Sequence, residues 1–412
     1  MTLTPPPPTH CDVLVVGAGP AGSACAQLLA RAGLHVLLAD QHSFPRDKVC
    51  GDGLIPDAHA ALRRLGVYDE VAAQARAVGH IGCVGPMGGR VDVPGSLSVI
   101  PRKLLDDILC RAAVAAGARL HTPLRFEAPL LEGERVVGAR LKAGEATHEI
   151  RAPWVVLATG AVPQALIAAG LCQRRTPSAV ALRGYVKNDA MVGRITTMEA
   201  VWHRRLRPGY GWIFPCPGGV FNIGVGVIHS HDRQAQGRFA MQDVNLREVF
   251  AAFCECYAPA RELMDGGTQL SELKGAPLRC SLEGASFTRP GMLATGEAAG
   301  STYAFTGEGI GKAMETGILA ARALLQGREQ GLDEAAVRRH YEAALLALKP
   351  RFDRYERANR LNEHLWLTDL LIWRAKKNPR ILRRMSGVLE ETDNPGSLVT
   401  ARGIAKLFLP LR

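Results

Sequence analysis

Long apolar runs and export signals are missing from this sequence. No run of 18 or more apolar residues occurs, so we expect no membrane-spanning helix. The N-terminal stretch MTLTPPPPTHCD has neither a basic segment nor an apolar one, which favours a disordered proline-rich leader over a secretory signal. The two absences predict a cytoplasmic protein, and contact with the inner face of the membrane stays open.

The ten cysteines show no disulfide-like or metal-binding spacing. Cys254 and Cys256 are one residue apart, which suits neither a CxxC redox pair nor a zinc site. Without an export signal, reduced thiols are the expected state. No cysteine follows Cys280, and this argues against an iron–sulfur cluster on clustered C-terminal cysteines. We therefore expect no metal site.

Positive charge is concentrated near the C-terminus. The net charge is +11, and residues 338–412 contribute +8 of it, with 16 Lys and Arg against 8 Asp and Glu. No aromatic-interleaved basic motif accompanies this charge, so nucleic acid is not an expected partner. Leucines and Trp373 alternate with basic residues here, as in an amphipathic helix. Such a helix can lie on a membrane surface, or it can pack its apolar face on the rest of the protein.

A strand, a glycine turn, a helix and a second strand are predicted near the N-terminus. The turn is GAGPAG, residues 17–22, and a short apolar run precedes it. Gly17 permits a tight turn, Gly19 lets a pyrophosphate approach the backbone, and Gly22 lets helix and strand pack closely. The N–H groups at the helix N-terminus can bind the phosphates. Asp40, after the second strand, is placed to accept hydrogen bonds from a ribose, so this unit predicts a dinucleotide site.

A second glycine-rich segment favours FAD over NAD(P) as that dinucleotide. In GMLATGEAAG, which starts at Gly291, a short strand ends at Gly296-Glu297. An acidic side chain at such a strand end can bind the ribityl hydroxyls of a flavin. Gly307-Glu308-Gly309 then begins a helix whose N-terminus can face the electron-rich edge of the flavin. An enzyme that uses only NAD has no need for this second turn.

Two further segments complete the expected cofactor site. In APWVVLATGAVPQ, a buried strand leads into a small-residue turn at Thr159 and Gly160, under the cofactor. Arg102 opens another helix and is a candidate for a pyrophosphate contact. The residues expected to contact FAD are Gly17, Gly19, Pro20, Ala21, Gly22, Asp40, Lys48, Cys50, Gly51, Arg102, Thr159, Gly160, Glu297, Gly307, Gly309 and Ile310.

The cofactor segments are separated by stretches in which apolar and polar residues alternate, as in strands with one buried face. We therefore predict an α/β fold with a Rossmann-like (GR2-type) FAD-binding domain, an inserted antiparallel sheet for the substrate and a helical C-terminal region. The predicted boundaries are 10–75, 101–170 and 281–330 for the first, 76–100 and 171–280 for the second, and 331–412 for the third. In GYGWIFPCPGG, Tyr210, Trp212 and Phe214 share one face of a strand, and Pro217-Gly218-Gly219 makes a hairpin turn.

These segments, in this order, resemble the geranylgeranyl reductase family of the p-hydroxybenzoate-hydroxylase-like FAD-dependent oxidoreductases. The family motif P-x-x-K-x-C-G-x-G is present as PRDKVCGDG, residues 45–53, and Y-x-W-x-F-P as YGWIFP, residues 210–215. The resemblance covers residues 10–330. It implies an enzyme that reduces C=C bonds of a hydrophobic, isoprenoid-like substrate. It also implies that Cys50, Tyr210 and Trp212 line the cavity beside the reactive ring of the flavin.

Individual residues of these motifs have expected roles. Cys50 has no histidine close in sequence, so we expect it to be a wall of the substrate cavity and not a nucleophile. Gly51 lets the chain pass close to the flavin, and Arg46 and Lys48 can help to hold the flavin. Tyr210 can donate a proton to the substrate.

Two departures from the family pattern leave an alternative open. Glu297 stands where Asp is usual and keeps the same acceptor chemistry, whereas Thr159 stands where many members have Asp. The second departure motivates a flavin-dependent monooxygenase that hydroxylates an aromatic or peptide-borne group. The W-x-W-x-I-P stretch typical of halogenases is absent. Without a second GxGxxG unit no nicotinamide domain is expected, and the electron donor stays open between NAD(P)H, ferredoxin and a partner reductase.

Overall fold

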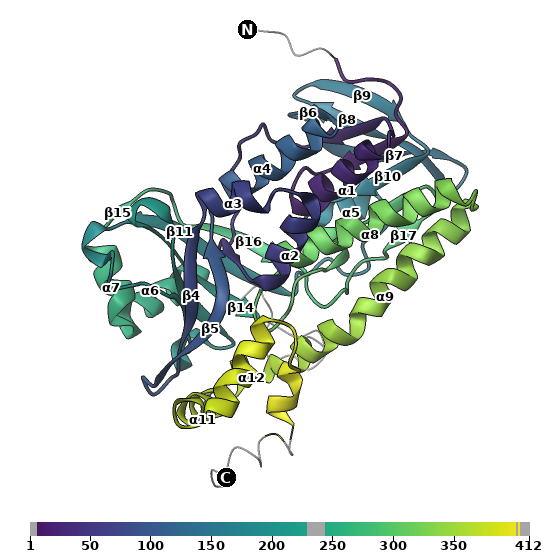
Figure 1. Cartoon of the computed structure of the whole chain (residues 1–412). Coiled ribbons are helices and arrows are strands. Elements are labelled where there is room, and N and C mark those ends of the chain that lie inside the picture. Colours follow the sequence, from purple (N-terminus) through teal and green to yellow (C-terminus); the bar gives the residue numbers. More distant parts are fainter. Residues whose placement is uncertain (1–5, 229–243, 401–402, 404–412) are drawn as a thin grey trace.

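The computed structural model describes residues 6–228, 244–400 and 403, so the start of the predicted leader lies outside the described residues. In this part the chain has the predicted α/β architecture, with a six-stranded, a nine-stranded and a three-stranded sheet. Figure 1 shows the nine-stranded sheet on the left, the six-stranded sheet on the right, and the last helices below them. The glycine turn and the strand with the aromatic row approach each other between the two larger sheets.

The six-stranded sheet contains the predicted strand, turn, helix and strand unit. In spatial order it consists of β17 (Thr288–Arg289), β18 (Met292–Ala294), β10 (Trp154–Leu157), β1 (Val13–Val16), β2 (Val36–Ala39) and β6 (Arg119–His121). All neighbours are parallel except β17 and β18. The central strands are fully buried runs of Val, Leu and Ala, as expected for a parallel sheet that is covered on both faces.

Different layers cover the two faces of this sheet. One face packs against α1 (Pro20–Arg31), α4 (Arg102–Ala115), α8 (Ile310–Glu329) and α9 (Glu334–Ala358). Next to them lie α2 (Pro56–Leu65) and α3 (Tyr68–Gln74). The other face packs against α5 (Pro163–Ala168) and the three-stranded sheet of β7 (Arg125–Glu132), β8 (Arg135–Ala143) and β9 (Ala146–Arg151). The small sheet was not distinguished in the sequence.

The nine-stranded sheet joins segments that lie far apart in the sequence. In spatial order it consists of β15 (Thr268–Gln269), β11 (Ala179–Lys187), β14 (Val220–Ile228), β13 (Gly209–Pro215), β12 (Met198–Val201), β4 (Arg76–Val84), β5 (Arg90–Val99) and β3 (Gly53–Leu54), and β16 (Lys274–Leu278) also pairs with β11. Neighbours are antiparallel except β12 and β4. The predicted hairpin turn connects β13 to β14 and has positive φ at Gly218 and Gly219. Because β3 begins at Gly53, the last residue of the motif at 45–53, this sheet holds the end of that loop.

The expectation of strands throughout 171–280 is wrong for residues 246–265. They form α6 (Leu246–Cys256) and α7 (Ala258–Asp265), which pack on one face of the nine-stranded sheet. In α6 the buried Phe250 and Phe253 lie one turn apart, which is a helical and not a strand spacing. The side chain of Asn245 also accepts a hydrogen bond from the N–H of Arg247, as a helix N-cap does. The opposite face of the sheet is not covered by α6 and α7, and residues on it line the cavity that is described below.

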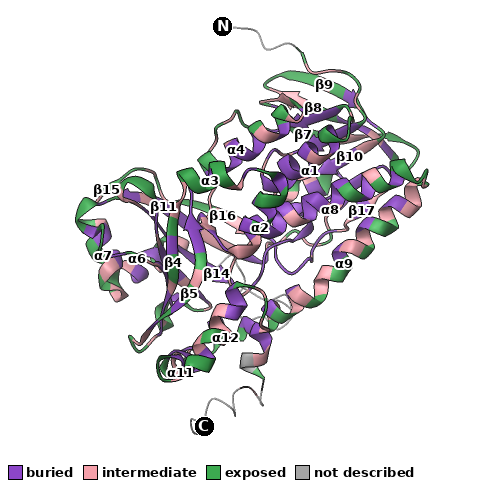
Figure 2. Cartoon of the chain, viewed as in Figure 1, coloured by how far each residue is buried: buried purple, intermediate pink, exposed green. Residues whose placement is uncertain are grey.

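The C-terminal region, predicted as 331–412, is mainly helical in its described residues, whereas 401–402 and 404–412 lie outside them. The part that follows α9 covers that opposite face and contains α10 (Arg360–Glu363), α11 (Leu365–Lys377) and α12 (Pro379–Leu389). Leu361, Leu367 and Leu371 are buried against β4, β5 and β12, so much of the apolar face packs on the protein. Along α11, whose position is marked in Figure 2, buried residues such as Leu367 and Leu371 alternate with exposed ones such as Trp373. Among the described residues, no helix combines the length and the hydropathy needed to cross a bilayer.

Candidate active site

A cavity of about 710 Å³ lies between the two larger sheets and the C-terminal helices. It is lined by every residue predicted to bind the cofactor or to act in catalysis except Gly22, namely Gly17, Gly19, Pro20, Ala21, Asp40, Lys48, Cys50, Gly51, Arg102, Thr159, Gly160, Tyr210, Trp212, Glu297, Gly307, Gly309 and Ile310. Residues separated by up to about 290 positions in the sequence therefore meet at one site.

The glycine turn at one end of the cavity has no space for side chains. Gly17 has φ +103°, and a Cβ there would lie 2.3 Å from the carbonyl oxygen of Ala158. A Cβ on Gly22 would lie 1.8 Å from the carbonyl oxygen of Gly17, so Gly22 is buried behind the turn and holds α1 against β1. With Pro20 at the first position of α1, the free N–H groups of this helix end face the turn. The turn is therefore a cradle for an anionic group.

Two arginines lie over this cradle and are fixed by one buried carboxylate. A Cβ built on Gly19 would be 3.5 Å from Nη2 of Arg46 and 4.0 Å from Nη2 of Arg102. Asp106 is fully buried and pairs with both, at 2.6 Å to Nε of Arg102 and 3.0 Å to Nη1 of Arg46. Arg46 also lies 3.5 Å from Asp40, whose other oxygen accepts a hydrogen bond from the N–H of Ala18. This places Arg46 on the phosphate and ribose side of the site.

Replacing Arg46 with glutamine is expected to weaken FAD binding about 10- to 100-fold, because one charge-assisted contact to the pyrophosphate is lost. Fluorescence titration of the apoprotein with FAD measures this change. Arg111→Gln is the matched control, since Arg111 pairs with Glu70 and Asp107 on the exposed side of α4. Equal FAD affinities for the two variants would rule out the phosphate contact.

An acidic residue, a lysine and a second helix N-terminus also line the cavity. Glu297 follows β18, and its Oε2 lies 4.0 Å from Nζ of Lys48. Gly309 caps the N-terminus of α8, a helix of 20 residues, so the positive end of that helix faces the cavity. The hydroxyl of Thr159 is buried and has no hydrogen-bond partner among the described residues, although Thr159 lines the cavity. Such a group needs a ligand or a water molecule as its partner.

These residues fit FAD. The cradle and its arginines suit the pyrophosphate, Asp40 suits the adenosine ribose, and Glu297 suits the ribityl hydroxyls. The N-terminus of α8 suits the electron-rich edge of the isoalloxazine, and the hydroxyl of Thr159 offers one more polar contact.

A buried lysine fixes the start of α8 relative to the C-terminal region. Lys312 is 2% exposed and lies 3.2 Å from Asp57 of α2, 3.0 Å from Glu315 and 2.8 Å from Glu391, which follows α12. Arg351 of α9 also pairs with Glu391, at 2.9 Å. Because unpaired buried charges are costly, this network holds α2, α8, α9 and the end of α12 in one arrangement.

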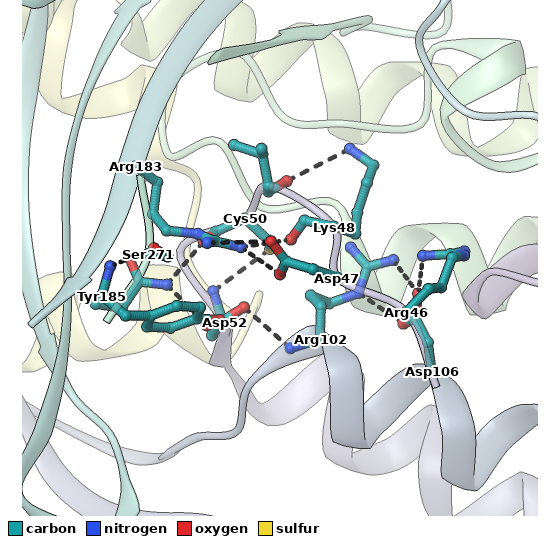
Figure 3. Close-up of polar contacts among 12 residues, drawn as sticks. Arg46, Asp47, Lys48, Cys50, Asp52, Arg102, Asp106, Arg183, Tyr185 and Ser271 are labelled. Atoms are coloured by element: carbon teal, nitrogen blue, oxygen red, sulfur yellow. Dashed lines mark hydrogen bonds and ion pairs between the residues drawn. The ribbon is translucent and has the colours of Figure 1, made fainter. Parts of the chain in front are cut away.

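The loop at residues 45–53 is held by side chains of the nine-stranded sheet that the sequence analysis missed. Arg183 of β11 is fully buried and donates hydrogen bonds to Oδ1 of Asp47 at 2.9 Å, the carbonyl of Lys48 at 2.8 Å and the carbonyl of Cys50 at 3.3 Å. Asn222 of β14 donates to the same Cys50 carbonyl at 2.8 Å. Figure 3 shows Arg183 reaching across to the loop from the sheet.

Asp52 is the centre of a second group of contacts to this loop. It is fully buried, with a positive φ of 65°, and accepts hydrogen bonds from the Tyr185 hydroxyl, from Nδ2 of Asn222 at 2.7 Å and from the N–H of Arg102 at 3.2 Å. Figure 3 shows Asp52 between Tyr185 and Arg102. One carboxylate thus links the sheet to the start of α4, beside the phosphate cradle. The motif could not have revealed this role, because Asp52 occupies one of its variable positions.

The burial of Asp52 makes stability depend on pH. Burial raises the pKa of this carboxyl to about 6 although Tyr185, Arg183 and Asn222 favour its charged form. Asp52 has a pKa near 4 in the unfolded chain, so between pH 4 and pH 6 the native state binds more protons at this group than the unfolded state does. The contribution of Asp52 to the free energy of unfolding should therefore fall by about 3 kcal/mol as the pH rises through this window. Urea denaturation of wild type and Asp52→Asn measures this, since the variant should lose that part of the decline. Burial also raises the pKa of Asp57 to about 6, so the contribution of Asp57 to the fall in the free energy of unfolding should be the same in both proteins.

The aromatic row of β13 lies on the cavity side of the sheet. The ring centroids of Tyr210 and Trp212, and of Trp212 and Phe214, are each 6.4 Å apart. A Cβ on Gly51 would be 3.2 Å from the ring of Phe214, so Gly51 lets the loop pass close to the row. Cys50 lies beside it, and its Sγ accepts a hydrogen bond from the N–H of Asp52 at 3.4 Å. The loop and the aromatic row together form one wall of the cavity.

Tyr210 keeps its proton in this arrangement. Burial and the negative charge of Glu308 raise its pKa, and its hydroxyl donates to the carbonyl oxygen of Thr306 at 2.5 Å. That contact holds Tyr210 against the turn before α8. Proton donation by Tyr210 to a substrate stays a prediction.

Beyond the aromatic row the cavity continues as an apolar arm between the sheet and the C-terminal helices. We call this part the apolar arm and define it by Ile81, Val93, Leu97, Met198, Leu371 and Ile372. The first four come from β4, β5 and β12, and the last two come from α11. The lining of the cavity by C-terminal helices could not be predicted from the sequence, because the contact of these helices with the sheet depends on the tertiary fold.

The comparisons with known proteins agree with this site. The family model of an FAD binding domain matches residues 10–205. The chain is 32% identical to a menaquinone reductase from Mycolicibacterium smegmatis, over 84% of this chain and 86% of the relative. It is 29% identical to a digeranylgeranylglycerophospholipid reductase from Methanosarcina mazei, over 78% of this chain and 76% of the relative.

A solved structure shares the fold along nearly the whole chain. It is a geranylgeranyl bacteriochlorophyll reductase-like protein from Thermoplasma acidophilum, with a TM-score of 0.72 and 22% identity, covering 97% of this chain and 95% of that chain. This likeness confirms the predicted fold. The family model and the relatives named as reductases confirm the predicted FAD-dependent oxidoreductase. The chain belongs to the geranylgeranyl reductase family of FAD-dependent oxidoreductases.

Proposed function

We propose that this enzyme reduces C=C bonds in the polyprenyl chain of a quinone or a lipid. The observation that carries the proposal is the apolar arm, which extends the cavity from the aromatic row to α11 and suits a long, flexible hydrocarbon chain. Relatives are named as reductases of menaquinone and of a digeranylgeranyl lipid, which supports the same substrate class.

Bound FAD supplies the two-electron chemistry of such a reduction, and the protein positions the substrate and excludes water. Tyr210, Trp212 and Phe214 form a wall against which a planar or branched isoprene unit can pack. The contacts of Arg183 and Asn222 fix the loop that carries Cys50, so the wall is rigid. The apolar arm keeps the rest of the chain out of water.

The experiment for this proposal follows flavin absorbance after the holoenzyme has been reduced without oxygen. Mixing it with an unsaturated polyprenyl quinone is expected to reoxidise the flavin, and the rate should fall as the polyprenyl chain is shortened. A matched quinone with a fully saturated chain controls for electron transfer to the quinone ring. Equal rates with the saturated and unsaturated quinones would contradict C=C reduction.

Replacing Cys50 with alanine is expected to leave the fold and FAD binding unchanged and to lower kcat/KM for the substrate roughly tenfold, since a small part of the cavity wall is removed. Steady-state kinetics and the flavin content after purification measure the two effects. Cys254→Ala is the control, because Cys254 lies on α6, away from the cavity lining. A complete loss of FAD in the Cys50 variant would contradict its role as a wall.

We also propose a cytoplasmic location for the enzyme. All ten cysteines are free thiols, including buried ones such as Cys25 and Cys110, which is the state expected in a reducing compartment. Labelling of fractionated cells with an antibody to the protein tests this location.

A further inference from the structure

Two tryptophans stand out on the surface of the C-terminal region. Trp366 is 56% exposed and Trp373 is 49% exposed, and their spacing of seven residues places them on the same side of α11. Nζ of Lys377 lies 4.7 Å from the ring centroid of Trp373. The leucines of α11 already pack inward, so the two exposed tryptophans do not contribute to its packing on the sheet. Exposed aromatic side chains of this kind indicate a surface that binds a partner.

A residue from the nine-stranded sheet extends the same surface. Met87 is 86% exposed and lies at the tip of the hairpin between β4 and β5. Its N–H donates a hydrogen bond to Oδ1 of Asp369 on α11 at 3.1 Å, which fixes the hairpin tip beside the helix. We call Met87, Trp366 and Trp373, with the cations described next, the tryptophan face.

Positive charge surrounds these apolar side chains. Lys376 and Lys377 end α11, and Arg380 and Arg383 follow on α12, and all four are exposed. Exposed tryptophans flanked by lysines and arginines match the boundary of a bilayer, where the rings lie at the headgroups and the cations attract anionic lipids. The chemistry of the tryptophan face therefore suits an anionic lipid surface.

The opposite side of the same helix faces the cavity. Thr368, Leu371 and Ile372 of α11 line the cavity, and Leu371 and Ile372 belong to the apolar arm. One helix thus separates the apolar arm from the tryptophan face. A substrate that leaves a bilayer at this helix would therefore meet the apolar arm directly behind it.

We propose that the tryptophan face docks on the surface of an anionic bilayer and that the polyprenyl substrate enters the apolar arm from the lipid at α11. The docking is inferred from the exposed tryptophans and cations of the tryptophan face. The entry route, in addition, rests on the proposed function. Docking of this kind is peripheral, because α11 has 13 residues and lies on the protein.

The test uses the full-length holoenzyme and sedimentation with vesicles. Vesicles of phosphatidylcholine with phosphatidylglycerol should bind the wild type at low salt, and vesicles of phosphatidylcholine alone should bind it much less. Trp366→Ser with Trp373→Ser, and separately Lys376→Glu with Lys377→Glu, should each weaken binding roughly tenfold or more. Leu131→Ser with Lys103→Glu is the control, since both residues are exposed and far from α11 in the fold, on β7 and α4. Wild type that does not bind anionic vesicles, or variants that bind as the control does, would overturn the docking.

Activity separates a failure of docking from a failure of the proposed function. With a short, detergent-dispersed polyprenyl quinone, the tryptophan and lysine variants should keep the wild-type rate, because their residues do not line the cavity. With the quinone embedded in vesicles, the same variants should lose most of the rate. Reduction of the dispersed quinone without vesicle binding refutes docking alone, and vesicle binding without any reduction refutes the proposed function alone. A wild-type dimer that the tryptophan substitutions convert to a monomer would assign this face to a second copy and overturn the proposal.

Discussion

Gly22→Ala is expected to yield a protein that retains almost no FAD. The new Cβ would lie 1.8 Å from the carbonyl oxygen of Gly17 and 3.2 Å from Cβ of Ala158, so α1 has to move away from β1. That movement opens the turn on which the pyrophosphate depends, and FAD affinity should fall by roughly 100-fold or more. Flavin absorbance after purification and titration of the apoprotein with FAD measure the effect.

Gly79→Ala provides the matched control for this substitution. A Cβ on Gly79 meets no heavy atom within 4 Å, and its backbone has no left-handed φ. This variant should retain the same flavin content as the wild type. A Gly22→Ala protein with full flavin content would show that the turn does not form the pyrophosphate site.

Arg183→Met should have the largest effect on the free energy of unfolding. The fully buried guanidinium donates to Asp47 and to the carbonyls of Lys48 and Cys50, and its removal takes one donor from each of them. The Cys50 carbonyl keeps its contact from Asn222. Because the side chain of Asp47 is 36% exposed, its charge is partly hydrated once Arg183 is gone, and the lost hydrogen bonds should cost about 2–3 kcal/mol. The loop at residues 45–53 should also lose its position, so FAD affinity and kcat/KM should both fall. Urea denaturation and FAD titration measure the two effects.

Arg140→Met is the control for the loss of an arginine from a strand. Arg140 forms an exposed pair with Glu149 at 3.0 Å, and such pairs contribute less than about 1 kcal/mol. Equal losses of stability in the two variants would mean that the contacts of Arg183 do not hold the loop.

The local features of the flavin-binding part could be predicted because they depend on neighbouring residues. The turn at Gly17, Gly19 and Gly22 needs its glycines for steric reasons, and the sequence displays them directly. The end of a strand before Glu297 and the start of α8 after Gly309 follow from the same kind of local pattern. The aromatic row of β13 follows from the alternation of side chains along a strand.

The contacts that hold these features together could not be predicted. Arg183 and Asn222 lie more than 130 residues after the loop that they bind, and nothing in their own neighbourhood marks them. Asp52 stands at a variable position of the motif, and its role depends on a contact with Tyr185 that only the fold creates. Helices α6 and α7 were missed because strands were predicted for the whole region from its alternation of apolar and polar residues. The segment that forms these two helices has a helical spacing of apolar residues instead. The apolar arm depends on α11 reaching β4 and β5, which is a property of the whole fold.

The most direct test of the central claim is the mass of the product from one turnover. The reduced holoenzyme is mixed with an unsaturated polyprenyl quinone, once without oxygen and once with isotopically heavy dioxygen. The account predicts, in the absence of oxygen, a product that has gained two hydrogen atoms in its polyprenyl chain. A product that forms only with oxygen and contains the heavy isotope would contradict the account and assign the enzyme to the flavin-dependent monooxygenases.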